Sequence, residues 1–362
     1  MPIPIVDSHI HLFPGSHLPT FAWYNPDGPL SAQHSVDQYR HATSSVPATS
    51  ETTDAKYLRG FIFLETDRVS SIEESESSGA PGWKHALDEV SLLTRIALGQ
   101  PVDGEGHGPS DKEFCLGIVP WAPVPGGPDV LRPYMEKVKK RTTTEEVWRK
   151  VCGVRYLVQD KPAGVMLQQK FIDGLRWLGR EGLAFDLGVD ARQGGLDQLR
   201  EAVEMMGRVY SNDAESPVTI VINHLCKPNL RLAPESVPTH PEYLEWKSLV
   251  TRMAAVSPRT YMKLSGAFSE LPPLSTESEP DINDLASRLQ PWTDVVFDAF
   301  GPDRIMFGSD WPVANIGGGG NDISWYRWRR VVERVFERRS LSEEQKAGIW
   351  GQVAITAYGI EL

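Results

Sequence analysis

The sequence predicts an α/β protein with a single (β/α)8 TIM barrel and a long loop insertion after strand 1. The main observation is that eight short apolar segments alternate with longer segments of helical periodicity. This alternation predicts parallel strands joined by right-handed crossovers, and eight units suffice to close a barrel. In addition, no Gly-x-Gly-x-x-Gly follows the first strand, which disfavours an open sheet with a dinucleotide site.

Strands are expected where a short apolar run ends in polar or turn-forming residues, and helices where apolar residues recur three and four positions apart. The predicted strands are Ile3–Phe13, Tyr57–Leu64, Phe114–Val119, Val151–Val158, Leu183–Val189, Val218–Asn223, Thr260–Leu264 and Arg304–Phe307. The predicted helices are Trp83–Leu98, one or two within Leu131–Val151, Phe171–Arg180, Leu196–Tyr210, Pro241–Val256, Leu285–Phe300, Trp325–Arg338 and Glu343–Tyr358.

The longest predicted connection, residues 14–55, follows the first strand and is rich in Pro, Ser, Thr, Asn and His. A helical piece is expected inside it at Ser35–Ala42. Compact folds rarely keep a connection of this length unless it covers something, so side chains such as Trp23 could line the mouth of a site. No linker divides the chain, and residues 1–362 are expected to form one domain.

Composition excludes several classes of partner. The formal charge is −11 and the sequence has no basic stripe, which argues against binding to nucleic acid or to an anionic membrane. No apolar run approaches the ~18 residues of a membrane span, and the N-terminus lacks a signal-type pattern. The three cysteines are odd in number and lie in apolar runs, as expected of reduced thiols. We therefore expect a cytoplasmic protein with a small-molecule partner; a homo-oligomer is left open.

Candidate site residues collect where the predicted strands end. His9 and His11 are two positions apart on an extended strand, so both imidazoles face one side. Such a pair suits one divalent cation or one electrophilic carbonyl, although His-x-His alone is weak evidence. In a barrel the carboxyl ends of all strands meet at one mouth, which adds the polar residues of the other strands to this pair. These are Glu65, Arg155, Gln159, Asp186, Asp190, His224, Lys227, Lys263, Ser265, Asp310 and Trp311.

Three motifs carry a family resemblance. Val-Asp-Ser-His-Ile-His at residues 6–11, Asn-His-Leu-Cys-Lys-Pro at 223–228 and Phe-Gly-Ser-Asp-Trp-Pro at 307–312 resemble the amidohydrolase superfamily. Gly-Val-Arg at 153–155 and Met-Lys-Leu-Ser-Gly at 262–266 resemble more narrowly its amidohydrolase-related branch that hydrolyses sugar lactones. The overall pattern is similar to fungal L-rhamnono-γ-lactonases. The resemblance implies hydrolysis of an aldonolactone, with L-rhamnono-1,4-lactone giving L-rhamnonate in L-rhamnose breakdown.

The resemblance also implies a metal site, with two departures from the family pattern. Members with two metal ions carry a bridging lysine or glutamate on strand four and histidines on strands five and six, whereas here strand four has Arg155 and Tyr156 and strand five has no histidine. At most one divalent ion is therefore expected, and zinc is the leading candidate. Its predicted ligands are His9, His11 and Asp310, with Glu65 as a further candidate. The alternative is a metal-free site in which these imidazoles and His224 donate hydrogen bonds.

The resemblance implies roles for the remaining candidates as well. Asp310 is the expected base that takes a proton from water and returns it to the leaving ring oxygen, and His224 and Arg155 complete the predicted catalytic set. Arg155 and Lys227 could hold hydroxyls or the nascent carboxylate. The other predicted substrate-binding residues are Lys263, Gln159 and Trp311, the last offering an apolar face to a sugar ring. Arg155 and Lys263 could instead pair with acidic neighbours.

Two alternative functions remain from the sequence. A decarboxylase or aromatic-acid hydrolase of the same branch would usually carry a histidine on strand five and an acidic residue beside the first histidine pair, and neither is present. A non-enzymatic barrel that only binds a sugar acid would predict a broken catalytic set. His9, His11, His224 and Asp310 are all present, so this second alternative is less favoured.

Overall fold

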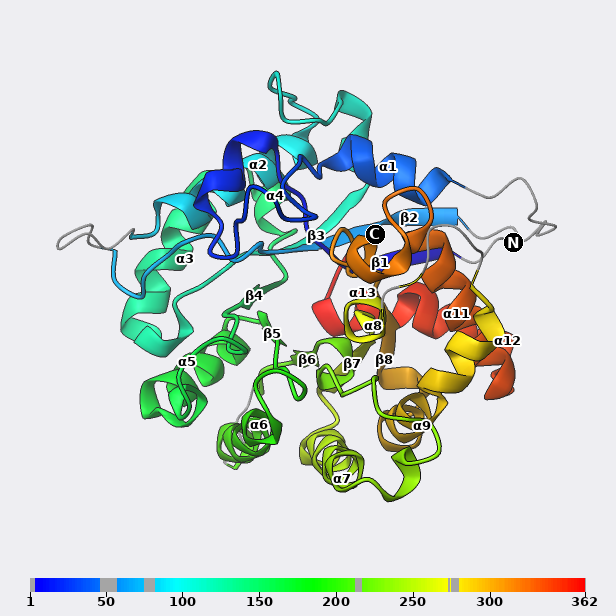
Figure 1. The fold of residues 1–362 in the computed structure, drawn as a ribbon. Coiled ribbons are helices and arrows are strands. Elements are labelled where there is room, and N and C mark those ends of the chain that lie inside the picture. Colours follow the sequence, from blue (N-terminus) through cyan, green and yellow to red (C-terminus); the bar gives the residue numbers. More distant parts are fainter. Residues whose placement is uncertain are drawn as a thin grey trace.

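The structure, a computed structural model, describes residues 4–45, 57–74, 82–211, 217–272, 274 and 280–361. The predicted (β/α)8 barrel is confirmed: parallel strands surround a central axis and the helices form an outer ring (Figure 1). The strands are β1 (Pro4–Ile10), β2 (Tyr57–Leu64), β3 (Cys115–Val119), β4 (Gly153–Arg155), β5 (Ala184–Leu187), β6 (Ile220–Ile222), β7 (Thr260–Leu264) and β8 (Ile305–Phe307).

The helices follow the strands as the apolar periodicity predicts. They are α1 (Val36–Ser44), α2 (Lys84–Leu98), α3 (Pro128–Thr142), α4 (Glu145–Trp148), α5 (Gln169–Arg180), α6 (Leu196–Tyr210), α7 (Pro241–Val256), α8 (Ala267–Glu270), α9 (Ile282–Phe300), α10 (Ala314–Gly318), α11 (Ser324–Arg338), α12 (Glu343–Ala347) and α13 (Val353–Tyr358). The predicted last helix, 343–358, is divided by a π-helical turn at Gly348–Gln352. Within the described chain, none of these helices is long and apolar enough to cross a membrane.

The strands pair in two sheets, in the orders β1-β2-β3 and β4-β5-β6-β7-β8. Backbone hydrogen bonds beyond the strand ends join the two sheets. On one side, Ala122 N donates to Arg155 O at 2.9 Å. On the other, Asp310 N donates to His9 O at 2.9 Å and His11 N donates to Trp311 O at 2.8 Å. This second seam is where the barrel closes, and it places the His9–His11 pair beside Asp310.

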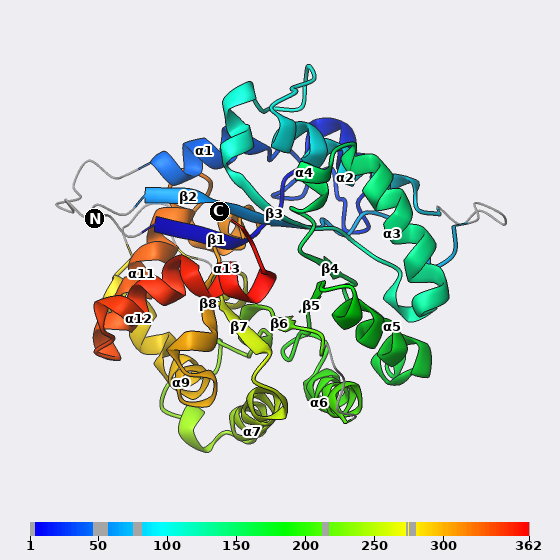
Figure 2. The ribbon, with the colours of Figure 1, turned by 180° about the vertical axis from the view of Figure 1, so that it is seen from behind.

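The opposite end of the barrel is closed by the C-terminal helix α13, which Figure 2 shows lying over the strands. Its buried side chains pack with residues that point into the barrel, among them Val6 of β1, Val221 of β6 and Met306 of β8. The Tyr358 hydroxyl reaches further and donates to Asp186 Oδ2 at 2.6 Å. The bottom of the barrel is thus a packed core, and a pocket of about 580 Å³ lies at the open end.

Strand β1 ends at Ile10 rather than Phe13, β3 and β8 each begin one residue later than predicted, and three other strands are also shorter than predicted. Val151–Val158, Leu183–Val189 and Val218–Asn223 become β4, β5 and β6, because the flanking residues leave the ladder for turns that enter the site. The long loop contains a 3-10 turn at Gly15–Thr20 and helix α1, with a capping box in which the backbone N–H of Ser35 donates to the side chain of Gln38. Residues 46–55 of this predicted loop lie outside the described residues.

Candidate active site

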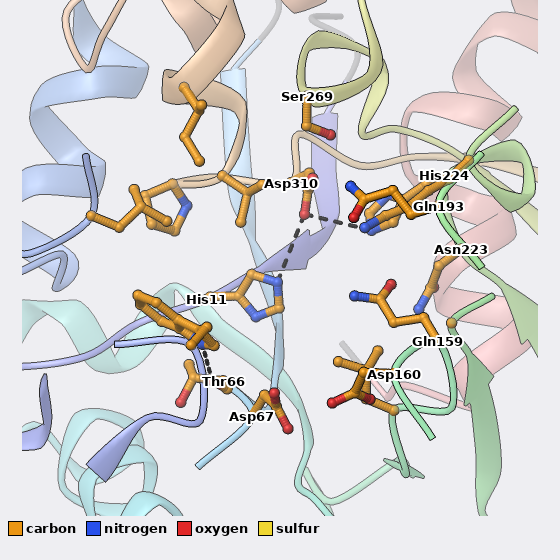
Figure 3. A pocket seen from close by; sticks show the side chains of 18 of the residues that line it. His11, Thr66, Asp67, Gln159, Asp160, Gln193, Asn223, His224, Ser269 and Asp310 are labelled. Carbon is orange, nitrogen blue, oxygen red and sulfur yellow. Dashed lines mark hydrogen bonds and ion pairs between the residues drawn. The ribbon is translucent and has the colours of Figure 1, made fainter. Parts of the chain in front are cut away.

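Four side chains converge at the open end of the barrel, from the ends of β1, β6 and β8, and Figure 3 labels three of them, His11, His224 and Asp310. One oxygen of Asp310, Oδ1, faces three imidazoles: the Nε2 atoms of His9 and His224 each lie 3.5 Å from it. His11 Nε2 lies 3.7 Å from the same oxygen and 3.2 Å from His9 Nε2. All four residues are buried. Residues separated by about 300 positions therefore form one compact cluster.

The backbone that presents these groups is unusual. Asp310 has φ 61°, and His224 to Lys227 are four consecutive non-glycine residues with φ between 45° and 61°. Left-handed conformations are disfavoured for L-residues and cluster at functional sites. The left-handed turn after β6 puts both His224 and Lys227 into the pocket while Cys226 packs in the core.

Gly266 packs directly against the His224 ring. Gly266 has φ 67°, and a Cβ there would lie 2.5 Å from His224 Nδ1, so neither the conformation nor the space tolerates a side chain. The same Nδ1 is 2.8 Å from the Ser265 hydroxyl, which fixes the ring and leaves Nε2 directed at Asp310. Ser265 is buried, which fits a positioning role better than that of a nucleophile.

The donor set of His9, His11 and Asp310 fits a divalent cation. Their ligand atoms lie within 4.8 Å of one another, with separations of 3.2, 3.5 and 3.7 Å. Ligands about 2.0–2.1 Å from a tetrahedral zinc ion lie about 3.3 Å apart. His11 donates from Nδ1 to the Leu64 carbonyl at 3.0 Å, so its Nε2 lone pair faces the site.

His9 is held differently, because its Nδ1 lies 3.3 Å from the Lys263 ammonium. While Nδ1 accepts from the ammonium, the ring proton lies on Nε2; Nε2 can bind a cation in the other neutral tautomer, with the proton on Nδ1. Lys263 also donates to Asp186 Oδ1 at 2.5 Å and is fully buried. The prediction that Lys263 binds substrate is therefore wrong: it pairs with an acidic neighbour below the pocket.

Glu65 and Arg155 form the second buried pair. Arg155 donates from Nε to Glu65 Oε1 at 2.5 Å and from Nη2 to the Glu65 carbonyl at 2.6 Å. Glu65 Oε2 accepts from the backbone N–H of Asp67. Glu65 thus lies outside the metal-capable group, in contrast to its prediction as a further ligand, because Arg155 and the backbone occupy its carboxylate. Arg155 itself lines the pocket.

Electrostatics set the protonation states of the cluster. Burial and the charge of Lys263 hold the pKa of His9 well below its usual value, and burial lowers the pKa of His224 to about 3 although Asp310 opposes this. Burial alone would raise the pKa of Asp310, but His224, the hydrogen bond with His11 and the Lys227 ammonium together outweigh it, and the pKa is lowered. At neutral pH the cluster therefore presents a carboxylate beside neutral His9 and His224 rings, which suits a base.

The pocket above the cluster has a volume of about 580 Å³ and two unlike walls. The apolar wall comes from the long loop after β1 and the segment after β8, and consists of Phe13, Ala22, Trp23, Leu30, Pro312, Val313 and Ile316. Trp23 is anchored by a hydrogen bond from Nε1 to the Thr66 carbonyl at 2.8 Å. The described part of the long loop therefore covers the site, as its length suggests.

The polar wall contains Gln159 and Lys227, two of the predicted substrate-binding residues. Trp311 is absent from it. Its ring is fully buried, packs against Tyr39 and donates from Nε1 to Asn321 at 2.8 Å. The prediction that Trp311 offers a face to a sugar is thus wrong, because the chain turns at Asp310 and the tryptophan points away from the pocket.

Several pocket residues were not assigned roles from the sequence. Asn223 directly precedes His224, and its place at a strand end was the signal that could have found it. Asp67 and Asp160 line one side, and burial together with the nearby Glu65 raises the pKa of Asp67 to about 6. Gln193 comes from the loop after β5, where no motif marks it.

Comparison with known proteins identifies the family. A family model described as Amidohydrolase matches residues 121–360. An L-rhamnono-gamma-lactonase of Scheffersomyces stipitis is 32% identical over 357 residues, which cover 98% of this chain and 98% of that protein. The chain belongs to the amidohydrolase family. A second relative of this amidohydrolase, an L-fucono-1,5-lactonase of Burkholderia multivorans, is 29% identical over 217 residues, 59% of this chain and 65% of that one.

Solved structures agree with the barrel. Two crystal structures of an amidohydrolase from Burkholderia multivorans, one with bound HEPES and one with bound zinc, match with TM-scores of 0.67 and 0.66. Each is 23% identical and covers 99% of both chains. At this identity the likeness shows that the amidohydrolase described here shares their fold.

Next to the pocket residue Thr66, Glu89 of α2 is a buried carboxyl that accepts from the backbone N–H and the hydroxyl of Thr66. Burial and the nearby Glu65 raise its pKa to about 8, whereas an unfolded glutamate titrates near 4.5. Between these values the folded amidohydrolase holds a proton that the unfolded chain has released, so the free energy of unfolding falls as pH rises from about 4.5 to 8.

Glu89→Gln is therefore expected to stabilise the protein at pH 8 by about 2 kcal/mol or more, since each pKa unit corresponds to about 1.4 kcal/mol. The amide keeps the Oε1 acceptor for Thr66 and cannot ionise. The gain should shrink as pH falls towards 5, which urea unfolding across this range would measure. Glu136→Gln, at an exposed position of α3, is the control with no such pH dependence. If the free energies of unfolding of wild type and Glu89→Gln changed in parallel with pH, the prediction would be contradicted.

Proposed function

We propose that this amidohydrolase hydrolyses a sugar-acid lactone, and that its substrate is L-rhamnono-1,4-lactone, which it converts to L-rhamnonate. The observation that supports this most strongly is the Asp310 carboxylate facing His9, His11 and His224 at the base of a pocket with one polar and one apolar wall. The 32% identical relative named L-rhamnono-gamma-lactonase and the relative named L-fucono-1,5-lactonase support the substrate class.

In the proposed mechanism Asp310 is the base. A water oxygen adds to the lactone carbonyl carbon while its proton passes to Asp310, and the carbonyl oxygen becomes an oxyanion. The bond from that carbon to the ring oxygen then breaks, and Asp310 returns the proton to the ring oxygen. The products balance as one hydroxy acid from one lactone and one water. The lowered pKa of Asp310 keeps the base ionised at neutral pH.

The oxyanion needs donors at the place where charge develops. His224 is positioned for this, because Ser265 and Gly266 fix its ring and Nε2 is directed at the cluster. If a divalent ion is bound, His9, His11 and Asp310 would hold it; the chemistry it supplies is polarisation of the carbonyl and a lowered pKa of bound water. We propose zinc as this ion, consistent with the zinc-bound structural relative.

The two walls of the pocket suit a deoxy-sugar lactone. Lys227, Gln159 and Arg155 can bind hydroxyls and the nascent carboxylate on the polar side. The terminal methyl group of a 6-deoxy lactone is apolar and fits the opposite wall, which includes Phe13 and Ile316. This arrangement supports a six-carbon deoxy-aldonolactone over a fully hydroxylated one.

A panel of aldonolactones tests the proposal. We expect acid release, followed by pH-stat titration, to be fastest with L-rhamnono-1,4-lactone, slower with L-fucono-1,5-lactone, and slower still with lactones that carry a 6-hydroxyl. Metal analysis of the purified protein should find about one divalent ion per chain, and prolonged chelation should lower kcat/KM at least 10-fold with recovery on adding zinc. Turnover of aromatic acids without turnover of any lactone would reject the proposal in favour of a decarboxylase or aromatic-acid hydrolase. Full activity without metal would reject the metal part alone.

A further inference from the structure

The most unusual polar group in the pocket is the side-chain amide of Asn223. The residue is 1% exposed and lines the pocket. Among the residues that the structure describes, neither its Oδ1 nor its Nδ2 has a hydrogen-bond partner. Buried amides are almost always paired, because leaving one unpaired forfeits the hydrogen bonds that water would make. An unpaired amide at the wall of a pocket is the state expected of a group that awaits a ligand.

The backbone keeps Asn223 in this place. Its N–H donates to the Leu187 carbonyl at 3.0 Å, and its own carbonyl accepts from the Cys226 N–H at 2.9 Å. The neighbouring Gly188 also lines the pocket and has no side chain that could pair with the amide. Figure 3 shows the amide of Asn223 between His224 and Gln159. The group therefore lies one residue from the proposed oxyanion donor, near the carbonyl end of a bound substrate.

We propose that Asn223 is a substrate-binding residue that recognises two neighbouring hydroxyls of the lactone, accepting from one at Oδ1 and donating to the other from Nδ2. This inference rests on the proposed lactonase function and deepens it by naming the group recognised. A side-chain amide presents one donor and one acceptor side by side, and a vicinal diol presents the complementary pair. The hydroxyls on C2 and C3 form such a pair in both 1,4- and 1,5-lactones, so recognition does not depend on ring size.

The expected selectivity follows from the burial. A lactone that lacks one of these hydroxyls leaves one end of the amide unpaired in the complex, and sites built around a hydrogen bond reject such analogues strongly. Removing the amide should abolish this discrimination. It should also stabilise the free protein, because an apolar side chain of similar shape carries no unpaired polar group.

The experiment compares wild type with Asn223→Leu, and with Asn223→Ala as a second variant, on L-rhamnono-1,4-lactone and its 2-deoxy and 3-deoxy analogues. Wild type should prefer the parent lactone over at least one analogue by 10-fold or more in kcat/KM. Both variants should lose about 10- to 100-fold on the parent, and the ratio between parent and analogue should fall towards one. A structural defect would lower kcat/KM equally for all three substrates and leave the ratio between parent and analogue unchanged.

Stability gives a second readout. The melting temperature of Asn223→Leu should rise, whereas Asn315→Leu is the matched control that should lower it, since the Asn315 amide bonds to Asn321 and Ser324. An unchanged substrate ratio in the Asn223 variants would overturn the inference while leaving the lactonase function standing. If wild type hydrolyses no lactone, the proposed function fails. The role of Asn223 is then tested by calorimetric measurement of L-rhamnonate binding. Equal affinity in wild type and Asn223→Leu would overturn that role.

Discussion

Asp310→Asn is expected to lower kcat/KM for L-rhamnono-1,4-lactone by about 10³-fold, the middle of the 10²- to 10⁴-fold range of general acid–base catalysis. The amide cannot take a proton from water, and it cannot return one to the ring oxygen. The substitution also replaces the negatively charged carboxylate oxygen, which lies 3.5 Å from His224 Nε2 and 3.7 Å from His11 Nε2, by a neutral amide. The loss should appear mainly in kcat, because the residues of the polar wall are untouched.

The same substitution should leave the fold intact. Asp310 has φ 61°, a conformation that asparagine adopts more readily than most other residues, so the turn after β8 is retained. Its backbone hydrogen bond to the His9 carbonyl is also unaffected. Circular dichroism and the unfolding midpoint would confirm this. Asp322→Asn, whose side chain is 82% exposed, is the matched control and should retain wild-type turnover. Wild-type turnover in Asp310→Asn would reject the proposed base.

The sequence predicts the fold well because its signals are local and repeated. The helical periodicity of residues 196–210 and the apolar run at 57–64 each match an observed element at both ends. The two-residue spacing of His9 and His11 predicts a shared face, and barrel closure then requires the end of β8 beside them. The cluster with Asp310 follows from these two facts without any knowledge of side-chain packing.

The departures from prediction have one physical origin, the direction of the chain where a strand becomes a loop. Trp311 follows a left-handed Asp310 and turns away from the pocket, whereas a continued strand could have kept it nearby. The left-handed run after Asn223 is invisible in the sequence, since it contains no glycine. Which acidic group neutralises Lys263 or Arg155 also depends on three-dimensional proximity. Strand-end position alone therefore finds the candidates but does not separate residues in the pocket from those below it.

Lys263→Met should destabilise the protein by about 3–5 kcal/mol, because it removes one partner of a buried ion pair and leaves the other charge uncompensated. Lys263 and Asp186 are both fully buried, with Nζ and Oδ1 2.5 Å apart. After the substitution the Asp186 carboxylate retains the Tyr358 hydroxyl, a single neutral donor, in the barrel interior. Methionine fills much of the volume of the lysine stem, so little of the loss should come from a cavity.

A double variant separates the charge from the packing. Lys263→Met combined with Asp186→Asn should recover most of the loss, since the amide carries no charge and still accepts from Tyr358, and removing both charges of a buried pair is often close to neutral. Urea unfolding of the two single variants and the double variant measures the coupling. Lys346→Met breaks the more exposed pair with Glu343 and should cost less than 1 kcal/mol. If Lys263→Met costs no more than Lys346→Met, the pair does not hold the barrel interior together, and Lys263 is retained for its contact with His9 instead.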